Sequence, residues 1–139
     1  MHNIVILGGN FAGVSTAHYL LRHVFPLLKN KTEYKVTLVS PSDHTFFKIG
    51  APRALVSSEK VPADKPFASI RNAFSDYKAS EFSFIQGEAV GVDEAIRTVS
   101  VRTSGLAKEI SVLYDSLVIA TGTTSVCITA TPNFNICEY

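Results

Sequence analysis

The 139-residue sequence predicts an α/β fold in which helices flank a parallel β-sheet and an antiparallel β-meander is added. Residues 3–7 form a short, almost wholly aliphatic run, as expected for a strand that is buried on both faces. Residues 11–25 then carry apolar side chains at helical spacing, and the β-rich run 34–39 follows. These segments make a β-α-β unit, whose crossover is right-handed in nearly all proteins.

Two further helices are expected after this unit. Pro52 suits the first position of a short helix over residues 52–56. Asp64 is expected to cap a longer helix over residues 64–77, because Pro66 falls in its first turn and apolar residues recur three and four positions apart.

The rest of the chain is expected to be rich in strands. Residues 82–85 predict another strand, and residues 116–120 predict the last buried one. Between them, three short segments indicate an antiparallel meander across one face of the sheet: residues 88–92, 98–102 and 109–113.

The character of the chain changes after residue 122. Residues 123–139 are rich in Thr, Ser, Cys and Asn and show no apolar periodicity. We therefore expect one folded domain over residues 1–122, followed by an irregular tail, 123–139, that is foreign to the fold.

Composition and charge exclude several classes of partner. The formal net charge is only +1, which gives no electrostatic case for binding nucleic acid or an anionic membrane surface. A small molecule is the expected partner. Cys127 and Cys137 fit neither a disulfide scaffold nor a zinc site, which favours a reducing, cytoplasmic setting. No signal peptide or apolar run of transmembrane length is recognisable.

A glycine-rich turn lies between the first expected strand and the first expected helix: Gly8, Gly9, Asn10, Phe11, Ala12 and Gly13. This is the context of a dinucleotide-binding fingerprint, in which Gly8 makes the tight turn, Gly13 lets the helix pack closely and the free helix amides face a pyrophosphate. Asn10 replaces the middle glycine; asparagine tolerates left-handed backbone geometry, and its amide can bind a phosphate or ribose oxygen. The alternative is a glycine-rich turn without a ligand.

The end of the second strand departs from the usual dinucleotide-binding pattern. An acidic residue normally binds the adenosine ribose there, whereas this chain has Ser40. Asp43 could substitute if its loop folds back, but a turn-forming aspartate is the commoner explanation, so Ser40 is ranked first. No basic residue follows closely that would hold a 2′-phosphate, which disfavours NADP at this site.

Three strings now show a specific resemblance: Ile-Val-Ile-Leu-Gly-Gly-Asn-Phe-Ala-Gly at 4–13, Val-Thr-Leu-Val at 36–39 and Tyr-Asp-Ser-Leu-Val-Ile-Ala-Thr-Gly at 114–122. They resemble, in order, the landmarks of the pyridine nucleotide-disulfide oxidoreductase superfamily. The likeness covers residues 3–122 and is strongest to the apoptosis-inducing-factor, ferroptosis-suppressor and type II NADH dehydrogenase group. Fungal relatives of that group also have an Asn-Phe-Ala-Gly turn and an Ala-Pro-Arg-Ala segment like residues 51–54.

The resemblance implies a Rossmann-type FAD-binding domain and assigns cofactor-binding roles by position. The Gly8 to Gly13 turn would hold the FAD pyrophosphate, and Ser40 would stand at the ribose. Arg53 would lie beside the flavin's phosphate or ribityl chain, although it can equally be an ordinary exposed arginine. The backbone of Val90 would meet adenine. The segment after the last strand would pass near FAD: Ala120, Thr121 and Gly122.

The resemblance also indicates a reaction class. Disulfide reductases of the superfamily have a redox cysteine pair soon after the second strand, and no cysteine precedes Cys127. A relative without that pair moves hydride from NAD(P)H to FAD and passes electrons to a quinone or another acceptor. No residue of this chain is assigned a catalytic role. The histidines have no spacing typical of a metal site or a catalytic triad, and His18 is expected on the helix surface.

The sequence is therefore interpreted as the N-terminal part of an FAD-dependent NAD(P)H oxidoreductase, truncated before its nicotinamide-binding domain and expected to be inactive alone. One alternative is a non-catalytic module that senses or sequesters a dinucleotide. Another is an unstable orphan with exposed apolar surface and no cofactor to stabilise it.

Overall fold

The computed structural model describes residues 1–30, 33–56, 62, 64–103 and 109–123. Most of the expected tail, and of the connection between the segments expected at 98–102 and 109–113, lies outside these residues. The elements follow in this order: β1 (His2–Leu7), α1 (Phe11–Tyr19), the π-helical η1 (Leu20–Val24), the 3₁₀-helical η2 (Phe25–Leu27), β2 (Tyr34–Ser40), β3 (His44–Phe46), α2 (Ala51–Val56), β4 (Phe67–Ser69), α3 (Ile70–Ala73), β5 (Phe82–Asp93), β6 (Thr98–Thr103), β7 (Glu109–Leu113) and β8 (Ser116–Ile119).

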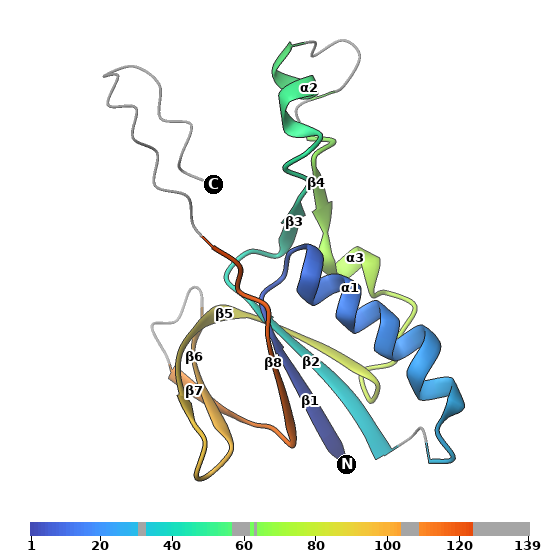
Figure 1. Ribbon diagram of the computed structural model, residues 1–139, viewed down its shortest axis with the longest axis vertical. Coiled ribbons are helices and arrows are strands. Elements are labelled where there is room, and N and C mark those ends of the chain that lie inside the picture. Colours follow the sequence, from blue (N-terminus) through green and yellow to red (C-terminus); the bar gives the residue numbers. More distant parts are fainter. Residues whose placement is uncertain (31–32, 57–61, 63, 104–108, 124–139) are drawn as a thin grey trace.

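Six strands form one curled sheet in the order β7-β6-β5-β2-β1-β8 (Figure 1). β8, β1, β2 and the first part of β5 run parallel, whereas β5, β6 and β7 pair antiparallel. The predicted fold class is therefore confirmed. Taken in chain order, the parallel strands have the spatial order 3-2-1-4, which is that of a Rossmann-type fold.

One face of the parallel sheet is covered by the continuous helical segment α1-η1-η2. The helix predicted over residues 11–25 is confirmed, with a π-helical turn in its second half. The residues buried in this layer are Ile6, Ala17, Leu21, Phe25, Val36, Leu38, Ile70, Phe74 and Phe82.

The opposite face is covered by the meander, as predicted. β5 is one long strand where two were expected, because it continues past the parallel sheet as the first strand of the meander. Its register shifts between Ala89 and Gly91, and a bulge of this kind bends a strand and increases its twist. The buried residues of this second core are Val5, Leu7, Val39, Val99 and Val101.

The helix expected over residues 64–77 is wrong for most of its length. α3 begins only at Ile70 and has a single turn, because the preceding residues form β4. Ser69 caps the helix in place of Asp64: its hydroxyl accepts a hydrogen bond from the backbone N–H of Asn72 at 3.4 Å.

Pairing across a hairpin explains why β4 replaces the helix. The rings of Phe46 and Phe67 stack with centroids 5.0 Å apart, and the Phe47 N–H donates to the Pro66 carbonyl at 2.7 Å. The helical spacing of apolar residues is overridden by these contacts.

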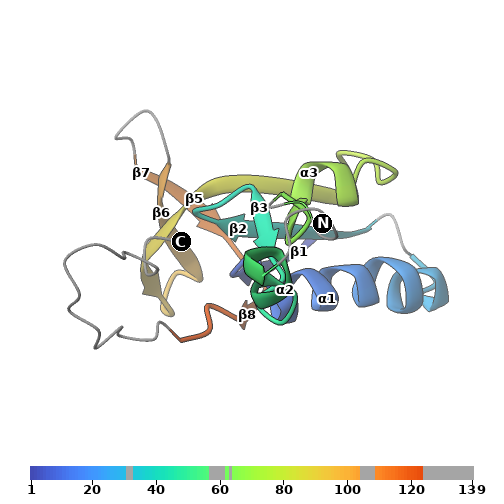
Figure 2. The ribbon, with the colours of Figure 1, turned by 90° about the horizontal axis from the view of Figure 1, so that it is seen from above.

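The β3–β4 hairpin and α2 project from the carboxyl ends of the parallel strands. In Figure 1 they rise above the sheet, and Figure 2 looks down onto α2 with the strands behind it. The short helix predicted over residues 52–56 is confirmed as α2, which begins one residue earlier. The carboxyl edge of the sheet therefore carries both the glycine-rich turn and this projecting arm.

Candidate functional site

The candidate site lies at the carboxyl edge of the sheet, where β1 and β8 end side by side. The chain leaves β1 toward β2 on one side, whereas β8 joins β1 on the other side. In open α/β sheets such a reversal of strand order creates a crevice in which ligands bind. The predicted site residues follow these strands.

Gly8 occupies a position that no other residue fits well. Its φ angle is +117°, a conformation that L side chains rarely adopt, and a Cβ there would collide with the carbonyl of Ala120. Two backbone hydrogen bonds fix this arrangement: Gly8 N–H donates to Val39 O at 2.8 Å, and Ala120 N–H donates to Leu7 O at 2.8 Å. The turn after β1 is therefore locked to the ends of both neighbouring strands.

The other two glycines of the turn are needed for close packing. A Cβ on Gly13 would strike the carbonyl oxygen of Gly8, so the glycine lets α1 pack directly on the turn, as predicted. A Cβ on Gly9 would lie 2.5 Å from Ser40 Oγ and 2.8 Å from Ile70 Cδ1. Close packing therefore requires glycine at both positions.

Asn10 is the N-cap of α1, and its backbone is extended, with φ −109° and ψ −160°. The left-handed geometry that asparagine tolerates is therefore not used here, and this position does not need the conformational freedom of glycine. The Asn10 carbonyl accepts the N–H of Val14 at 2.9 Å, but the side chain makes no capping hydrogen bond and is exposed. The first turn contains no acidic residue, so the amides and dipole of the helix remain available to an anion.

Phe11 and Ala12 complete the turn. Phe11 is half exposed, and its ring meets that of Phe47 edge to face with centroids 5.7 Å apart. Ala12 is exposed, and its carbonyl accepts the hydroxyl of Thr16 at 2.7 Å. Phe47, which follows β3 in the projecting arm, therefore contacts the start of α1.

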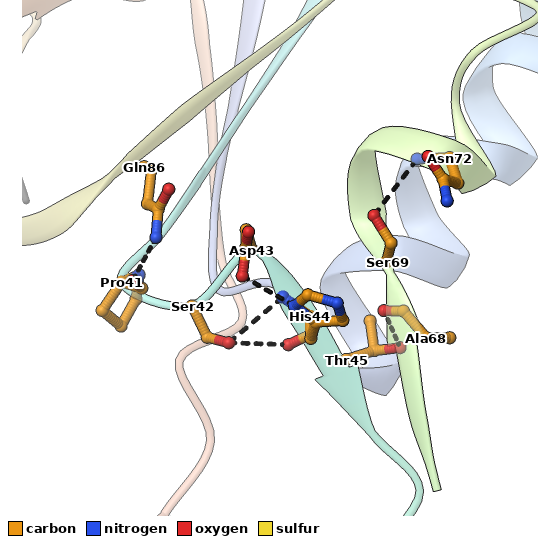
Figure 3. A network of polar contacts seen from close by, with 9 residues as sticks. All are labelled: Pro41, Ser42, Asp43, His44, Thr45, Ala68, Ser69, Asn72 and Gln86. Atoms are coloured by element: carbon orange, nitrogen blue, oxygen red, sulfur yellow. Dashed lines mark hydrogen bonds and ion pairs between the residues drawn. The ribbon is translucent and has the colours of Figure 1, made fainter. Parts of the chain in front are cut away.

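Ser40 ends β2 and is only 4% exposed. The loop that follows it is held by the polar contacts drawn in Figure 3. Asp43 Oδ1 accepts a hydrogen bond from His44 Nδ1 at 2.7 Å, and the Ser42 hydroxyl bonds to both the backbone N–H and the carbonyl of His44. Gln86 reaches back to the carbonyl of Pro41 at 3.5 Å.

The remaining predicted residues divide between the edge and the arm. Ala120 contacts Gly8, and Thr121 and Gly122 follow it, exposed, at the same edge. Val90 lies at the bulge of β5; because Gln86 already pairs with Ser40, Val90 also extends beyond the carboxyl end of β2.

Arg53 lies apart from the other predicted site residues. It is exposed on α2, beyond the β3–β4 hairpin, and its backbone N–H bonds to Gly50 at 3.1 Å. The structure does not bring it to the glycine-rich turn.

Two features of this region were missed by sequence reasoning. His18, expected on the helix surface, stacks on Phe74 with centroids 4.1 Å apart, and its Nδ1 is buried without a hydrogen-bond partner among the described residues. Burial, and then the charge of Arg22, lower its pKa. The second feature is the hydrogen bond between the side chains of Asp43 and His44. The sequence could have indicated it, because the two residues are adjacent.

Comparison with known proteins places this geometry in a family. A family model described as pyridine nucleotide-disulphide oxidoreductase matches residues 2–136. The chain belongs to this family. The oxidoreductase phnG of Penicillium herquei is 43% identical over 120 residues, which cover 86% of this chain and 28% of that protein. The oxidoreductase ptaL of Pestalotiopsis fici is 43% identical over 122 residues, which cover 88% of this chain and 32% of that protein.

Proteins of known structure share this fold. NDH2 from Plasmodium falciparum in complex with NADH superposes with a TM-score of 0.69 at 24% identity, covering 90% of this chain and 23% of that one. The water-forming NADH oxidase of Lactobacillus brevis superposes with a TM-score of 0.70 at 17% identity, covering 93% and 27%. The chain thus spans about a third or less of the length of these relatives.

None of the helices in the described ranges is long and apolar enough to cross a membrane. Nor do the same residues contain a group of three His, Cys, Asp or Glu side chains that could hold a metal ion.

Proposed function

We propose that this chain is the FAD-binding part of a flavin-dependent NAD(P)H oxidoreductase. The family match supports the general class, a pyridine nucleotide-disulphide oxidoreductase domain. The observation that carries the finer proposal is the tight turn at Gly8, which packs against Ala120 and leads into the N-terminus of α1, where no side chain caps the helix. A bare backbone turn ahead of a helix N-terminus is suited to a pyrophosphate.

The residues present fit a dinucleotide of this size. The amides of the turn and the side chain of Asn10, which is exposed and does not cap the helix, would hold the pyrophosphate. The backbone of Val90 would meet the adenine.

The other predicted contacts belong to the same proposal. Ala120, Thr121 and Gly122 would border FAD beside the turn, because they lie at the same edge of the sheet. The contact of Arg53 with the cofactor stays a prediction. It requires the projecting arm, formed by the β3–β4 hairpin and α2, to lie over the cofactor.

Bound FAD would supply the redox chemistry, accepting a hydride from NAD(P)H and passing electrons to a quinone or another acceptor. The part of this chain is to bind and orient the cofactor. We also propose a cytoplasmic setting, a domain that ends at residue 122, and no nucleic-acid partner.

FAD binding to residues 1–139 tests the proposal. Titration of the purified chain with FAD, followed by flavin absorbance and thermal shift, is expected to show saturable binding. Riboflavin, which lacks the pyrophosphate and adenosine, is expected not to compete, whereas ADP is. A soluble, folded protein that does not respond to FAD would disprove the assignment.

The alternative, a dinucleotide-binding module without turnover, is separated by a second step. NADH is added to the FAD-loaded chain without oxygen, and flavin absorbance near 450 nm is followed, since that band bleaches on reduction. Bleaching supports an oxidoreductase. Binding of FAD without bleaching is expected both of an isolated FAD-binding part and of a module, so only bleaching separates the two.

A further inference from the structure

We propose that Asp43, three residues beyond the end of β2, holds the ribose hydroxyls of the bound dinucleotide in place of Ser40. The inference rests on the proposed function and deepens it, because it moves a recognition element away from the position where dinucleotide folds normally have it.

Ser40 is poorly placed to meet a ligand. It is 4% exposed, and its side chain packs beneath Gly9, where an added Cβ would lie 2.5 Å from Ser40 Oγ. A single enclosed hydroxyl also cannot accept from two ribose hydroxyls as a carboxylate can. The structure therefore gives Ser40 a packing role under the turn.

Asp43 lies beside the same turn but faces solvent. Its backbone carbonyl accepts the N–H of Ile70 at 2.9 Å, and the side chain of Ile70 reaches Gly9. Asp43 and Gly9 are thus both in contact with one residue. The side chain of Asp43 is 41% exposed, so its carboxylate is accessible to a ligand.

The carboxylate is oriented before any ligand arrives. His44 Nδ1 lies 2.7 Å from Oδ1, and Ser42 Oγ fixes the His44 backbone through bonds of 3.1 Å to its N–H and 3.0 Å to its carbonyl (Figure 3). Among the described side chains, only that of His44 hydrogen-bonds this carboxylate, so its oxygens can accept a further hydrogen bond from a ribose hydroxyl. Such preorganisation lowers the cost of ordering a binding group.

The charge state also suits this role. The hydrogen bond from His44 lowers the pKa of Asp43, which outweighs the opposite effect of desolvation, and the charges of His44 and Arg71 act in the same lowering direction. The carboxylate is therefore ionised at neutral pH, and a charged acceptor binds hydroxyl groups more strongly than a neutral one.

Nucleotides that differ only in the ribose test this inference. ADP, 2′-deoxy-ADP and 3′-deoxy-ADP are each used to displace FAD from residues 1–139. The wild-type chain is expected to prefer ADP over at least one deoxy analogue by about tenfold, the effect of one charge-assisted hydrogen bond. Asp43→Asn is expected to reduce that preference to about twofold or less. His44→Ala, which removes the positioning residue, is expected to lose part of the same preference.

Matched variants keep the result interpretable. Asp76→Asn removes an exposed carboxylate elsewhere, and Ser40→Ala removes the buried hydroxyl; both are expected to keep the preference for ADP. If Asp43→Asn fails to fold, Asp43→Glu keeps the charge, displaces the carboxylate and is expected to lose the preference as well.

Several outcomes would overturn the inference. The first is a wild-type chain that binds FAD but does not prefer ADP over either deoxy analogue. The second is a preference for ADP that survives both substitutions at Asp43. The third is a preference for ADP that is abolished by Ser40→Ala or increased by Ser40→Asp. Absence of FAD binding to the folded wild-type chain is a different result, because it defeats the proposed function itself.

Discussion

The Cα atom of Gly8 lies against the carbonyl of Ala120, so a side chain at residue 8 cannot be accommodated between the ends of β1 and β8. The φ angle of +117° adds a second, independent requirement for glycine. This contact joins two segments more than 100 residues apart, at the turn where the proposed cofactor would lie.

Gly8→Ala is therefore expected to destabilise the protein by about 3 kcal/mol or more, because it combines backbone strain with a clash against backbone atoms. Gly122→Ala is a graded comparison: its φ is +72° but nothing lies near its Cβ position, so only strain of about 1–2 kcal/mol is expected. Urea unfolding followed by circular dichroism measures both.

Gly91→Ala is the matched control for these variants, since its φ is not positive and the nearest atom to a Cβ would be 4.0 Å away. Its stability is expected to stay within about 0.5 kcal/mol of wild type. Equal losses in all three variants would contradict the steric explanation.

Two leucines of the same helical segment test the packing of α1-η1-η2 on the sheet. Leu21 is 7% exposed and lies in the core, whereas Leu27 is 85% exposed. Leu21→Ala is expected to cost about 2–5 kcal/mol of unfolding free energy, and Leu27→Ala less than about 0.5 kcal/mol. Similar losses from the two variants in denaturant unfolding would show that this face of the helix is misassigned.

His18 is expected to make stability depend on pH. Its pKa is lowered from 6.5 in the folded protein by burial and by Arg22, so the unfolded chain takes up the proton more readily. Stability should therefore be fully present above pH 6.5 and decrease as the pH falls through the lowered folded-state pKa. Thermal unfolding from about pH 8 to about pH 5 measures this trend.

His18→Phe is the control for the histidine effect, because it keeps a ring to stack on Phe74 but cannot titrate. It should flatten the pH dependence over this range. The Asp43 carboxylate does not interfere, since its pKa is lowered from 3.8 and its contribution is lost only at more acidic pH. An unchanged slope in His18→Phe would rule out His18 as the source.

Asn10→Asp is expected to separate folding from binding. A carboxylate at the N-cap suits the helix dipole, so stability should stay the same or rise by about 0.3–1 kcal/mol. The same charge would repel a pyrophosphate, so FAD affinity should fall by about tenfold. FAD titration and thermal unfolding of one preparation give both values.

Asn10→Gly provides the neutral comparison, because the extended backbone of Asn10 does not depend on its side chain. It should lose much less affinity than Asn10→Asp. An aspartate variant that binds FAD as well as wild type would place the pyrophosphate elsewhere.

Much of the site was predictable because its signals are local. A strand, a tight turn and a helix N-terminus are adjacent in sequence, so the roles of Gly8 and Gly13 followed from spacing alone and agree with their packing. The geometry of Asn10 was not predictable, because the exposure and dihedral angles of one turn residue depend on how the helix is seated.

Local patterns in the amino-acid sequence were enough to predict the α/β class, the first β-α-β unit, the alternating strands of the meander and the position of the glycine-rich turn. These depend on hydrophobic period and on glycine's conformational freedom, which act over a few residues. That residues 67–69 form a strand could be seen only in the folded protein, because the strand depends on the pairing of Phe67 with Phe46 across a hairpin. The folded protein likewise shows that Ser40 lies buried under Gly9 while Asp43 is exposed. The sequence could not indicate this difference, because burial depends on contacts between segments distant along the chain.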